Sequence, residues 1–403
     1  MEPHRSNASE PVLTDPGDYS FVLGGPLYQL LRRAHLTGTD LELARQRILV
    51  LTALAWLPLL VLSAAQGLAL GSNVAVPFLR DIDANARFLL VVPLLIAAEI
   101  TVHRRLRFVA RQFVERELIP SGARHQFDAA ITATRRLRDS IPAELALIAV
   151  VYVVGIQVVW RNYSALDVAT WYATPTPDGK TLTLAGTWYV YVSLPFSQFL
   201  LLRWYYRLFI WARFLWQMAR IDLRLVPVHP DRTGGLGFLS LATLAFTPLA
   251  VAHGTLVSAF IATRIFQQHA ALLDFKVGIV VLVVFMLVLF LGPFLAFTPR
   301  LTHTWRQGER DYGPLAERYA HQFDAKWVHT EAPPRDPLLG SNDIQSLADM
   351  ANVYNVARTM RFTPVTRQAI IQVAVATLAP IAPLALTMMP LAQLVKLLAG
   401  MLF

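Results

Sequence analysis

The chain has 403 residues, of which 55% are hydrophobic and 16% charged, and it carries a net charge of +9 and no cysteine. The lack of cysteine excludes disulfides, thiolate nucleophiles and iron–sulfur clusters. Soluble domains contain roughly 45–50% apolar residues, so the total alone does not separate a soluble protein from a membrane protein. The distribution of the apolar residues does.

Apolar runs of about 20 residues, the length that crosses a bilayer core, recur along the chain. Helices that are apolar on every side belong in lipid and not at the surface of a soluble protein. The sequence therefore predicts an all-α fold, a polytopic transmembrane helical bundle with seven spans. The predicted spans are Ile48–Leu70, Ala86–His103, Ile141–Trp160, Gly186–Ile210, Leu241–Thr263, Val277–Phe297 and Gln368–Pro390.

The basic residues alternate between the two sides of the predicted membrane. Of the 36 lysines and arginines, 29 lie in residues 1–47, 104–140, 203–240 and 298–367. Cytoplasmic loops carry such an excess, which places the N-terminus in the cytoplasm and the C-terminus outside. Membrane lipids with anionic headgroups are the expected partners of these cations, and no nucleic-acid partner is expected.

The residues before the first span divide into two parts. Residues 1–20 are polar and predict a disordered cytoplasmic N-terminus, without the apolar core of a cleavable signal. Residues 21–47 contain the amphipathic stretch PLYQLLRRAHL, which predicts a helix lying on the inner leaflet.

The tetrapeptide His-Gln-Phe-Asp occurs twice, beginning at His125 and at His321, each 21 residues after an arginine that closes a span. Related helix-start patterns precede spans 3 and 7, and spans 1 and 5 share a pattern with an aromatic residue two positions before a proline. Such self-similarity predicts two parallel three-helix repeats joined by span 4. The repeats are 48–160 and 241–390, the connecting region is 161–240, and 391–403 form a C-terminal tail.

Two loops carry local structure signals. In the external residues 161–185, Asp178-Gly179 between alternating stretches predicts a hairpin turn. In the cytoplasmic segment 298–367, Ser341 is placed to cap a helix on which Ile344, Leu347, Ala351 and Tyr354 recur at helical spacing. This segment predicts a small intracellular helical layer.

The stretch VPVHPDRTGGLGFL (Val226–Leu239) combines charge with backbone freedom. Gly234 and Gly235 allow backbone amides to bend towards an anion, and His229, Asp231 and Arg232 are adjacent. One interpretation is a binding site for an anionic headgroup or solute. The favoured alternative is a tight helix start, capped by Asp231 or Thr233.

Polar side chains inside the predicted spans are candidates for a solute or ion pathway, because such groups are costly in lipid. His253 lies near the middle of span 5, where the alternative is a neutral histidine bonded to a neighbouring helix. Glu99 lies about 7 Å inside the cytoplasmic edge at 1.5 Å per residue, and pairing with an arginine is the favoured alternative. The remaining pathway candidates are Gln157, Gln198 and Gln372, with Pro380 and Pro383 predicted to kink span 7.

Two further acidic positions have local interpretations. Glu144 follows Pro142 in a first helical turn, where it compensates the helix dipole. The pairs His125/Asp128 and His321/Asp324 have i,i+3 spacing, so each pair shares a helix face. They are weak candidates for a metal site shared by the two repeats, with surface hydrogen bonds as the alternative. The sequence predicts no cofactor and no catalytic residue.

Three segments resemble a widespread family of bacterial polytopic inner-membrane proteins of uncharacterised activity. They are HPDRTGGLGFL, DPLLGSNDIQSLADMANVYNVARTMR and VPFLRDIDANARFLLVVPLLIAAE, and the likeness extends from about Ala44 to Arg367. The resemblance implies a location in the bacterial inner membrane and no particular activity. The 3+1+3 layout is also similar to that of the SWEET sugar transporters, with the opposite orientation and without their substrate motifs.

These features favour a channel or transporter that moves a small solute or ion. Small anions are the first substrate class to consider, because arginine-rich cytoplasmic loops raise their local concentration. The alternative is a non-transporting sensor or assembly module with a cytoplasmic docking layer. An enzyme is not expected, since no nucleophile–base pair or cofactor motif occurs at a recognisable spacing. Self-association is left open.

Overall fold

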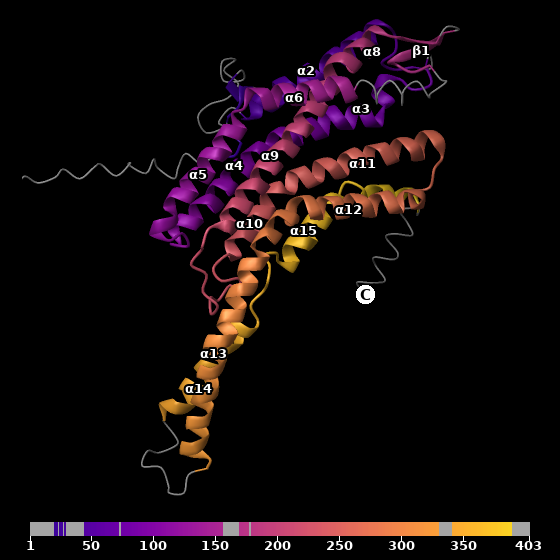
Figure 1. Ribbon diagram of the computed structural model, residues 1–403. Coiled ribbons are helices and arrows are strands. Elements are labelled where there is room, and N and C mark those ends of the chain that lie inside the picture. Colours follow the sequence, from indigo (N-terminus) through magenta and orange to yellow (C-terminus); the bar gives the residue numbers. More distant parts are fainter. Residues whose placement is uncertain are drawn as a thin grey trace, which may run out of the picture.

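The computed structural model describes residues 20–22, 24–26, 28–29, 44–71, 74–155, 169–176, 179–329 and 341–388. Within these residues the chain is mostly helical, and one short hairpin supplies the strands (Figure 1). Several predicted features lie outside the described residues. They are the part of span 3 beyond Gly155, which includes Gln157, and the C-terminal tail 391–403. Of the predicted turn Asp178-Gly179, Asp178 also lies outside them. The predicted all-helical class is confirmed at this coarse level.

Among the described residues, four continuous helices are long and apolar enough to cross a membrane, namely Arg45–Ala65, Ile82–Glu115, Gly237–Gln268 and Leu272–Trp327. They contain the predicted spans 2, 5 and 6 and most of span 1, whose last residues, 66–70, lie beyond the end of the first helix. Three of them run on beyond the apolar stretch because amphipathic turns continue the helix where hydropathy falls. Their parts are α2 (Ala44–Ala65), α3 (Ile82–Ala86), α4 (Val92–Glu115), α10 (Ser240–Thr243), α11 (Thr247–Gln268), α12 (Lys276–Leu291) and α13 (Thr298–Trp327).

The other three predicted spans are also helical but differ in length or polarity. Span 3 begins with α6 (Ile141–Val150), capped by the side chain of Ser140 as its sequence predicts. Span 4 lies in α8 (Leu184–Trp188) and α9 (Leu194–Arg220), joined by a π-helical turn and interrupted by buried arginines. Span 7 is α15 (Arg367–Leu378), followed by a 3₁₀ segment, Ala382–Thr387. Neither α6 with its extension to Gly155 nor α15 reaches membrane-spanning length among the described residues.

Helix α4 lies between α2 and α11 and supplies much of the core. Thr101 donates a hydrogen bond to the carbonyl of Ala245, which fixes α4 against the start of the 237–268 helix. On the other side, Ser193 donates to the carbonyl of Ala55 at 2.7 Å. Side chain to backbone hydrogen bonds of this kind hold the helices together inside the apolar bundle.

Helices α11, α12 and α15 form a second packed group. Gly254 of α11 lies so close to α15 that an added Cβ would stand 2.1 Å from the carbonyl oxygen of Thr377. The carbonyl of Pro380, where α15 has ended, accepts a hydrogen bond from Ser258 at 2.7 Å. The predicted break at the prolines is thus present, and a neighbouring helix satisfies a carbonyl that the break frees.

The predicted hairpin is confirmed as β1 (Ala173–Thr176) and β2 (Gly179–Leu182), which pair antiparallel with Ala173 opposite Leu182. Just before it, the indole of Trp171 is fully buried and donates to the carboxylate of Asp81, the residue that caps α3. This contact ties the hairpin to the start of the 82–115 helix.

Helices α13 and α14 (Asn342–Arg358) extend away from the bundle side by side, as a two-helix stalk (Figure 1). The predicted cap of α14 is confirmed, since the hydroxyl of Ser341 accepts from the amide of Asp343. The buried residues of α13 lie near the bundle, and in α14 only Ala357 is buried. The predicted intracellular layer is thus a projecting hairpin.

The two His-Gln-Phe-Asp copies lie in different settings. The first begins α5 (Arg124–Arg138), which packs on α9, whereas the second lies in the stalk. Phe127 is buried and Phe323 only half-buried. The paired prolines of spans 1 and 5 also differ, because Pro58 lies inside α2 while Pro248 lies in the first turn of α11. The internal repeat therefore stays a prediction.

Candidate functional site

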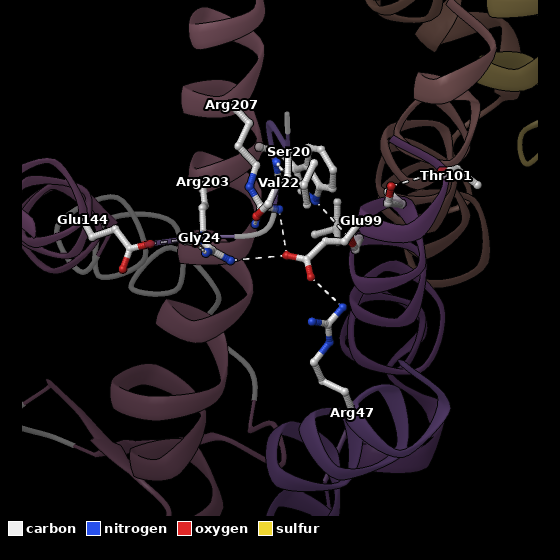
Figure 2. A network of polar contacts seen from close by, with 12 residues as sticks. Ser20, Val22, Gly24, Arg47, Glu99, Thr101, Glu144, Arg203 and Arg207 are labelled. Carbon is white, nitrogen blue, oxygen red and sulfur yellow. Dashed lines mark hydrogen bonds and ion pairs between the residues drawn. The ribbon is translucent and has the colours of Figure 1, made fainter. Parts of the chain in front are cut away.

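A cluster of buried charged side chains surrounds Glu99 inside the bundle. Arg47 of α2 and Arg207 of α9 contact its carboxylate at 2.6 and 2.7 Å, and Arg203 of α9 contacts it at 3.3 Å. Arg203 also contacts Glu144 of α6 at 3.2 Å. Figure 2 shows the guanidinium groups converging on Glu99 from two helices, with Arg203 and Arg207 on one and Arg47 on the other. The pairing favoured by the sequence is present, with three arginines in place of one.

Helix geometry explains why these side chains meet. Arg203 and Arg207 are four residues apart on α9, so they lie on the same face. Between them, the indole of Trp204 donates to the carbonyl of Leu95 at 2.9 Å and fixes α9 against α4 one turn before Glu99. Glu144 lies in the first turn of α6, where it also compensates the helix dipole as predicted.

The formal charges of this cluster do not balance within the described part of the chain. Three arginines face two glutamates, which leaves an excess of one positive charge. An unpaired ion that is removed from water costs several kcal/mol. A further negative charge or dipole that reaches the cluster would therefore stabilise it.

Arg47 has unused donors in this setting. It is only 1% exposed, and its Nε and Nη1 atoms have no hydrogen-bond partner among the residues that the structure describes. Buried guanidinium donors are normally satisfied. The arginine cluster, which we define as Arg47, Glu99, Glu144, Arg203 and Arg207, thus offers both charge and donors to a small anion.

A segment from near the N-terminus covers one side of the arginine cluster. Arg207 donates to the carbonyl of Val22 at 3.1 Å, and Arg203 donates to the carbonyl of Gly24 at 3.3 Å. The ring of Phe21 packs edge-on against two buried aromatic rings of α9, Trp211 and Phe214. Neutral carbonyls thus supply part of the negative potential that the excess charge demands.

His253 of α11 is buried and bonded through both ring nitrogens. Nδ1 lies 2.7 Å from the carbonyl of Leu249, and Nε2 lies 2.7 Å from the hydroxyl of Tyr205 on α9. The simplest assignment has Nδ1 donating to the carbonyl and Nε2 accepting from the hydroxyl, which is a neutral imidazole. This is the geometry of the alternative that the sequence left open, a histidine bonded to a neighbouring helix.

The remaining pathway candidates are not gathered at one point. Gln372 of α15 donates to the hydroxyl of Thr247 at the start of α11. Gln198 of α9 packs against Gly155, while Gln157 lies outside the described residues. Pro380 and Pro383 follow the end of α15. The intramembrane polar candidates therefore form three separate groups. Glu99 contacts arginines, His253 contacts Tyr205, and Gln372 contacts Thr247.

The loop 226–239 folds around its own carboxylate. The amides of Thr233 and Gly235 donate to Oδ1 of Asp231 at 2.8 and 3.1 Å, and the amide of Gly237 donates to Oδ2 at 2.7 Å. Burial acts to raise the pKa of Asp231, but these three bonds outweigh it and hold the pKa below its usual value. The amides that the sequence offered to an external anion are thus occupied.

The charged neighbours of Asp231 complete this tight helix start. His229 Nδ1 lies 2.9 Å from Oδ1 of Asp231. Arg232 has a positive φ of 55°, and Gly234 and Gly235 follow with φ of 64° and 101°. The carbonyl of Arg232 accepts from the amide of Arg361 at 2.7 Å. The loop therefore joins the 237–268 helix to the segment between α14 and α15.

The two candidate metal pairs are not brought together. His125 and Asp128 lie on α5, whereas His321 and Asp324 lie on the projecting part of α13 (Figure 1). His321 lies 3.8 Å from Glu317, and Asp324 contacts His329 at 2.8 Å. No group of three or more His, Asp or Glu side chains suited to a metal occurs among the described residues. The contacts of His321 and Asp324 are local and lie at the surface, as the alternative to a metal site predicted.

Sequence reasoning did not identify the arginines that complete the cluster. Arg203 and Arg207 lie inside the predicted span Gly186–Ile210, where a charged side chain signals a site by itself. They were instead interpreted with the basic residues that follow that span. Arg47 gave no comparable signal, because it lies just before the first apolar run.

Comparison of the chain with protein-family models, curated proteins and solved structures gave no match.

Proposed function

We propose that this protein passes a small monovalent anion across the bacterial inner membrane, as a channel or a carrier, with the arginine cluster as a binding position on the path. The proposal includes the seven-span topology with a cytoplasmic N-terminus and a parallel 3+1+3 repeat. It includes no enzymatic step. His253, Gln198 and Gln372 are its candidates for side chains elsewhere along the path.

The observation that carries this proposal is the unbalanced positive charge of the buried cluster. A purely structural ion-pair network gains most when each charge has a partner, because removal from water is costly. Here the helices hold three guanidinium groups around two carboxylates, and two nitrogens of Arg47 have no hydrogen-bond partner in the described part of the chain. A monovalent anion is the ligand that brings the formal charge to zero.

The test is anion flux in proteoliposomes that contain the purified protein, with nitrate, chloride, potassium and protons compared. We expect nitrate or chloride flux without potassium flux. Arg47→Gln should reduce the anion flux by about tenfold or more, since a hydrogen bond to a charged group contributes about 1.5–3 kcal/mol. Arg105→Gln, an exposed arginine on α4, is the matched control and should conduct like the wild type.

Two results would reject the proposal. One is a folded wild-type protein that passes no anion above the rate of empty liposomes. The other is an Arg47→Gln protein that is folded and conducts as well as the control, because the cluster would then lie off the path.

A second candidate function is supported by the stalk. Helices α13 and α14 project from the bundle and contact each other through few fully buried residues. Exposed apolar side chains on the stalk include Leu315, Ile344 and Val353. This surface supports the alternative of an assembly module that docks another protein. This alternative predicts that the folded, full-length protein passes no anion, which the flux measurement above tests directly.

A further inference from the structure

The segment that covers the arginine cluster is held by contacts to several helices. We define it as the strap, made of Ser20, Phe21, Val22, Gly24 and Gly25. The hydroxyl of Ser20 lies 2.9 Å from Nδ1 of His103, one helical turn after Glu99 on α4. The amide of Gly25 donates to the carboxylate of Asp139 at 2.9 Å, beyond the end of α5.

Two strap side chains, Phe21 and Val22, are buried as deeply as the core. Phe21 is 3% exposed and Val22 is 1% exposed. Arg138 donates to the carbonyl of Ser20 and pairs with Asp139, which binds the amide of Gly25. Gly24 passes so close to Arg138 and Asp139 that an added Cβ would lie 2.3 Å from their side-chain atoms. The position of the strap is thus specified by packing as well as by hydrogen bonds.

The same two arginines serve both the strap and Glu99. Arg203 and Arg207 each direct one guanidinium nitrogen to the carboxylate and another to a strap carbonyl. Bonds to the strap carbonyls and bonds to an anion share a charged donor, but only an anion adds the Coulomb attraction between opposite charges, which is strong where water is excluded. An anion at the cluster would therefore displace neutral carbonyls, and it would also supply the missing negative charge.

We propose that the strap closes the arginine cluster and that one small monovalent anion opens it by competing for Arg203 and Arg207. This inference rests on the proposed function for its physiological meaning, because the strap would then regulate the path. The competition itself is a separate physical claim. It requires that anion binding and strap docking exclude each other.

The first experiment measures whether an anion releases the strap. The chain contains no cysteine, so Val22→Cys provides a unique label at a buried position. We would measure its rate of reaction with a water-soluble maleimide in detergent, in sodium nitrate and in sodium gluconate of equal ionic strength. Nitrate should raise the rate in a saturable manner, and gluconate, a much larger anion, should not.

Phe21→Ala in the same background tests the anchoring of the strap. Loss of a buried phenyl ring shifts a local equilibrium by about tenfold or more. The labelling rate of Val22→Cys should therefore rise at least about tenfold without nitrate. Phe108→Ala is the matched control, because Phe108 is 47% exposed on α4 and should leave the rate unchanged.

The second experiment locks the strap. Ser20→Cys with His103→Cys replaces two side chains in contact, and oxidation should join them. Anion flux in proteoliposomes should fall to background in the oxidised protein and recover on reduction, while Phe21→Ala should raise flux. The oxidised and reduced forms are the same polypeptide, so misfolding is excluded as a cause of reversible loss.

The outcomes separate the two proposals. Nitrate-dependent labelling without flux in any variant would support the strap and reject anion passage. Flux that is equal in the oxidised and reduced proteins, with the disulfide verified by mass spectrometry, would overturn the strap as a closure. A labelling rate that is independent of nitrate would overturn the competition.

Discussion

At the scale of single residues, Asp231 supplies the negative charge around which the loop 226–239 folds. Three backbone amides donate to its carboxylate. Asp231→Ala would leave those donors without their acceptor, and a buried unsatisfied donor costs about 1–3 kcal/mol. We expect the variant to lower the free energy of unfolding by about 2–4 kcal/mol in total, measured by thermal or denaturant unfolding in detergent.

The matched control is Asp222→Ala. The Asp222 side chain is 88% exposed and pairs with Arg300 at 2.7 Å. Exposed pairs of this kind contribute about 0–1 kcal/mol. If Asp222→Ala lost as much stability as Asp231→Ala, the three amide bonds to Asp231 would contribute no more than an exposed ion pair does.

The pH dependence of the same variant has a definite sign. The pKa of Asp231 is lower in the folded protein than its ordinary value, near 3.9 when unfolded. Such a group contributes its stability above the unfolded pKa, and that contribution is lost as the pH falls through the folded pKa. The stability difference between wild type and Asp231→Ala should therefore shrink below about pH 4. A difference that stays constant down to the acid transition would contradict this cause.

Residue chemistry also shows what sequence could predict about the arginine cluster. A glutamate inside an apolar span requires a partner, so pairing of Glu99 with arginine was predictable. The number and origin of those arginines were not, because α2 and α9 approach Glu99 only through tertiary packing. For the loop 226–239, a tight helix start capped by Asp231 or Thr233 was the favoured interpretation, and Asp231 indeed accepts from three loop amides. An aspartate beside glycines can cap its own loop or leave the amides to a ligand, so residue types favoured one interpretation without excluding the other.

At the scale of elements, the close approach of α11 and α15 depends on Gly254. A methyl group there would meet the carbonyl of Thr377 at 2.1 Å and the ring of Pro380 at 3.2 Å. Relief of a contact with backbone requires the helices to separate, and overpacking typically costs about 1–3 kcal/mol. Gly254→Ala should therefore lower the thermal midpoint of unfolding, measured in detergent micelles.

Gly278→Ala on α12 is a control with the opposite expected sign. An added Cβ at Gly278 meets nothing within 4 Å. Alanine is favoured over glycine inside a helix by roughly 0.5–1 kcal/mol, so this variant should be neutral or slightly more stable. If both variants shift stability in the same direction, helix propensity and not helix contact governs Gly254.

The sequence predicted where helices occur better than it predicted where each helix begins and ends. Hydropathy located the apolar parts of the helices 82–115, 237–268 and 272–327. It could not locate their ends, because amphipathic turns continue each helix after the lipid-like composition stops. The fourth span shows the converse. Its tyrosines, tryptophans and buried arginines lower its apolarity, although α8 and α9 run with the bundle.

At the scale of the whole molecule, the chain divides into a helical bundle and the projecting stalk. The base of the stalk is fixed to the bundle, since Arg300 of α13 donates to the carbonyls of Ala219 and Arg220 at the end of α9 and Gly308 abuts Pro227. The outer part is held by contacts between its own helices, including that of Lys326 with Asp343 at 2.8 Å. The hydrophobic pattern predicted helices here but not their projection, which depends on how the base is attached.

This division separates the two candidate functions. Replacement of residues 315–350 by a short Gly/Ser linker removes the outer stalk and keeps its base contacts. Because distant, independent parts contribute additively to stability, the thermal midpoint of the bundle should change by no more than about 2 °C. If anion passage is the function, flux in proteoliposomes should match that of the full chain.

A matched variant tests the same idea without deletion. Asp343→Ala removes the contacts with Lys326 and Trp327 at the far end of the stalk. It should loosen that end, measured as faster amide hydrogen exchange in α14, and leave exchange in α4 and α11 unchanged. Faster exchange that spreads into the bundle, together with lost flux in the linker variant, would show that stalk and bundle act as one unit. That result would contradict anion passage by the bundle alone.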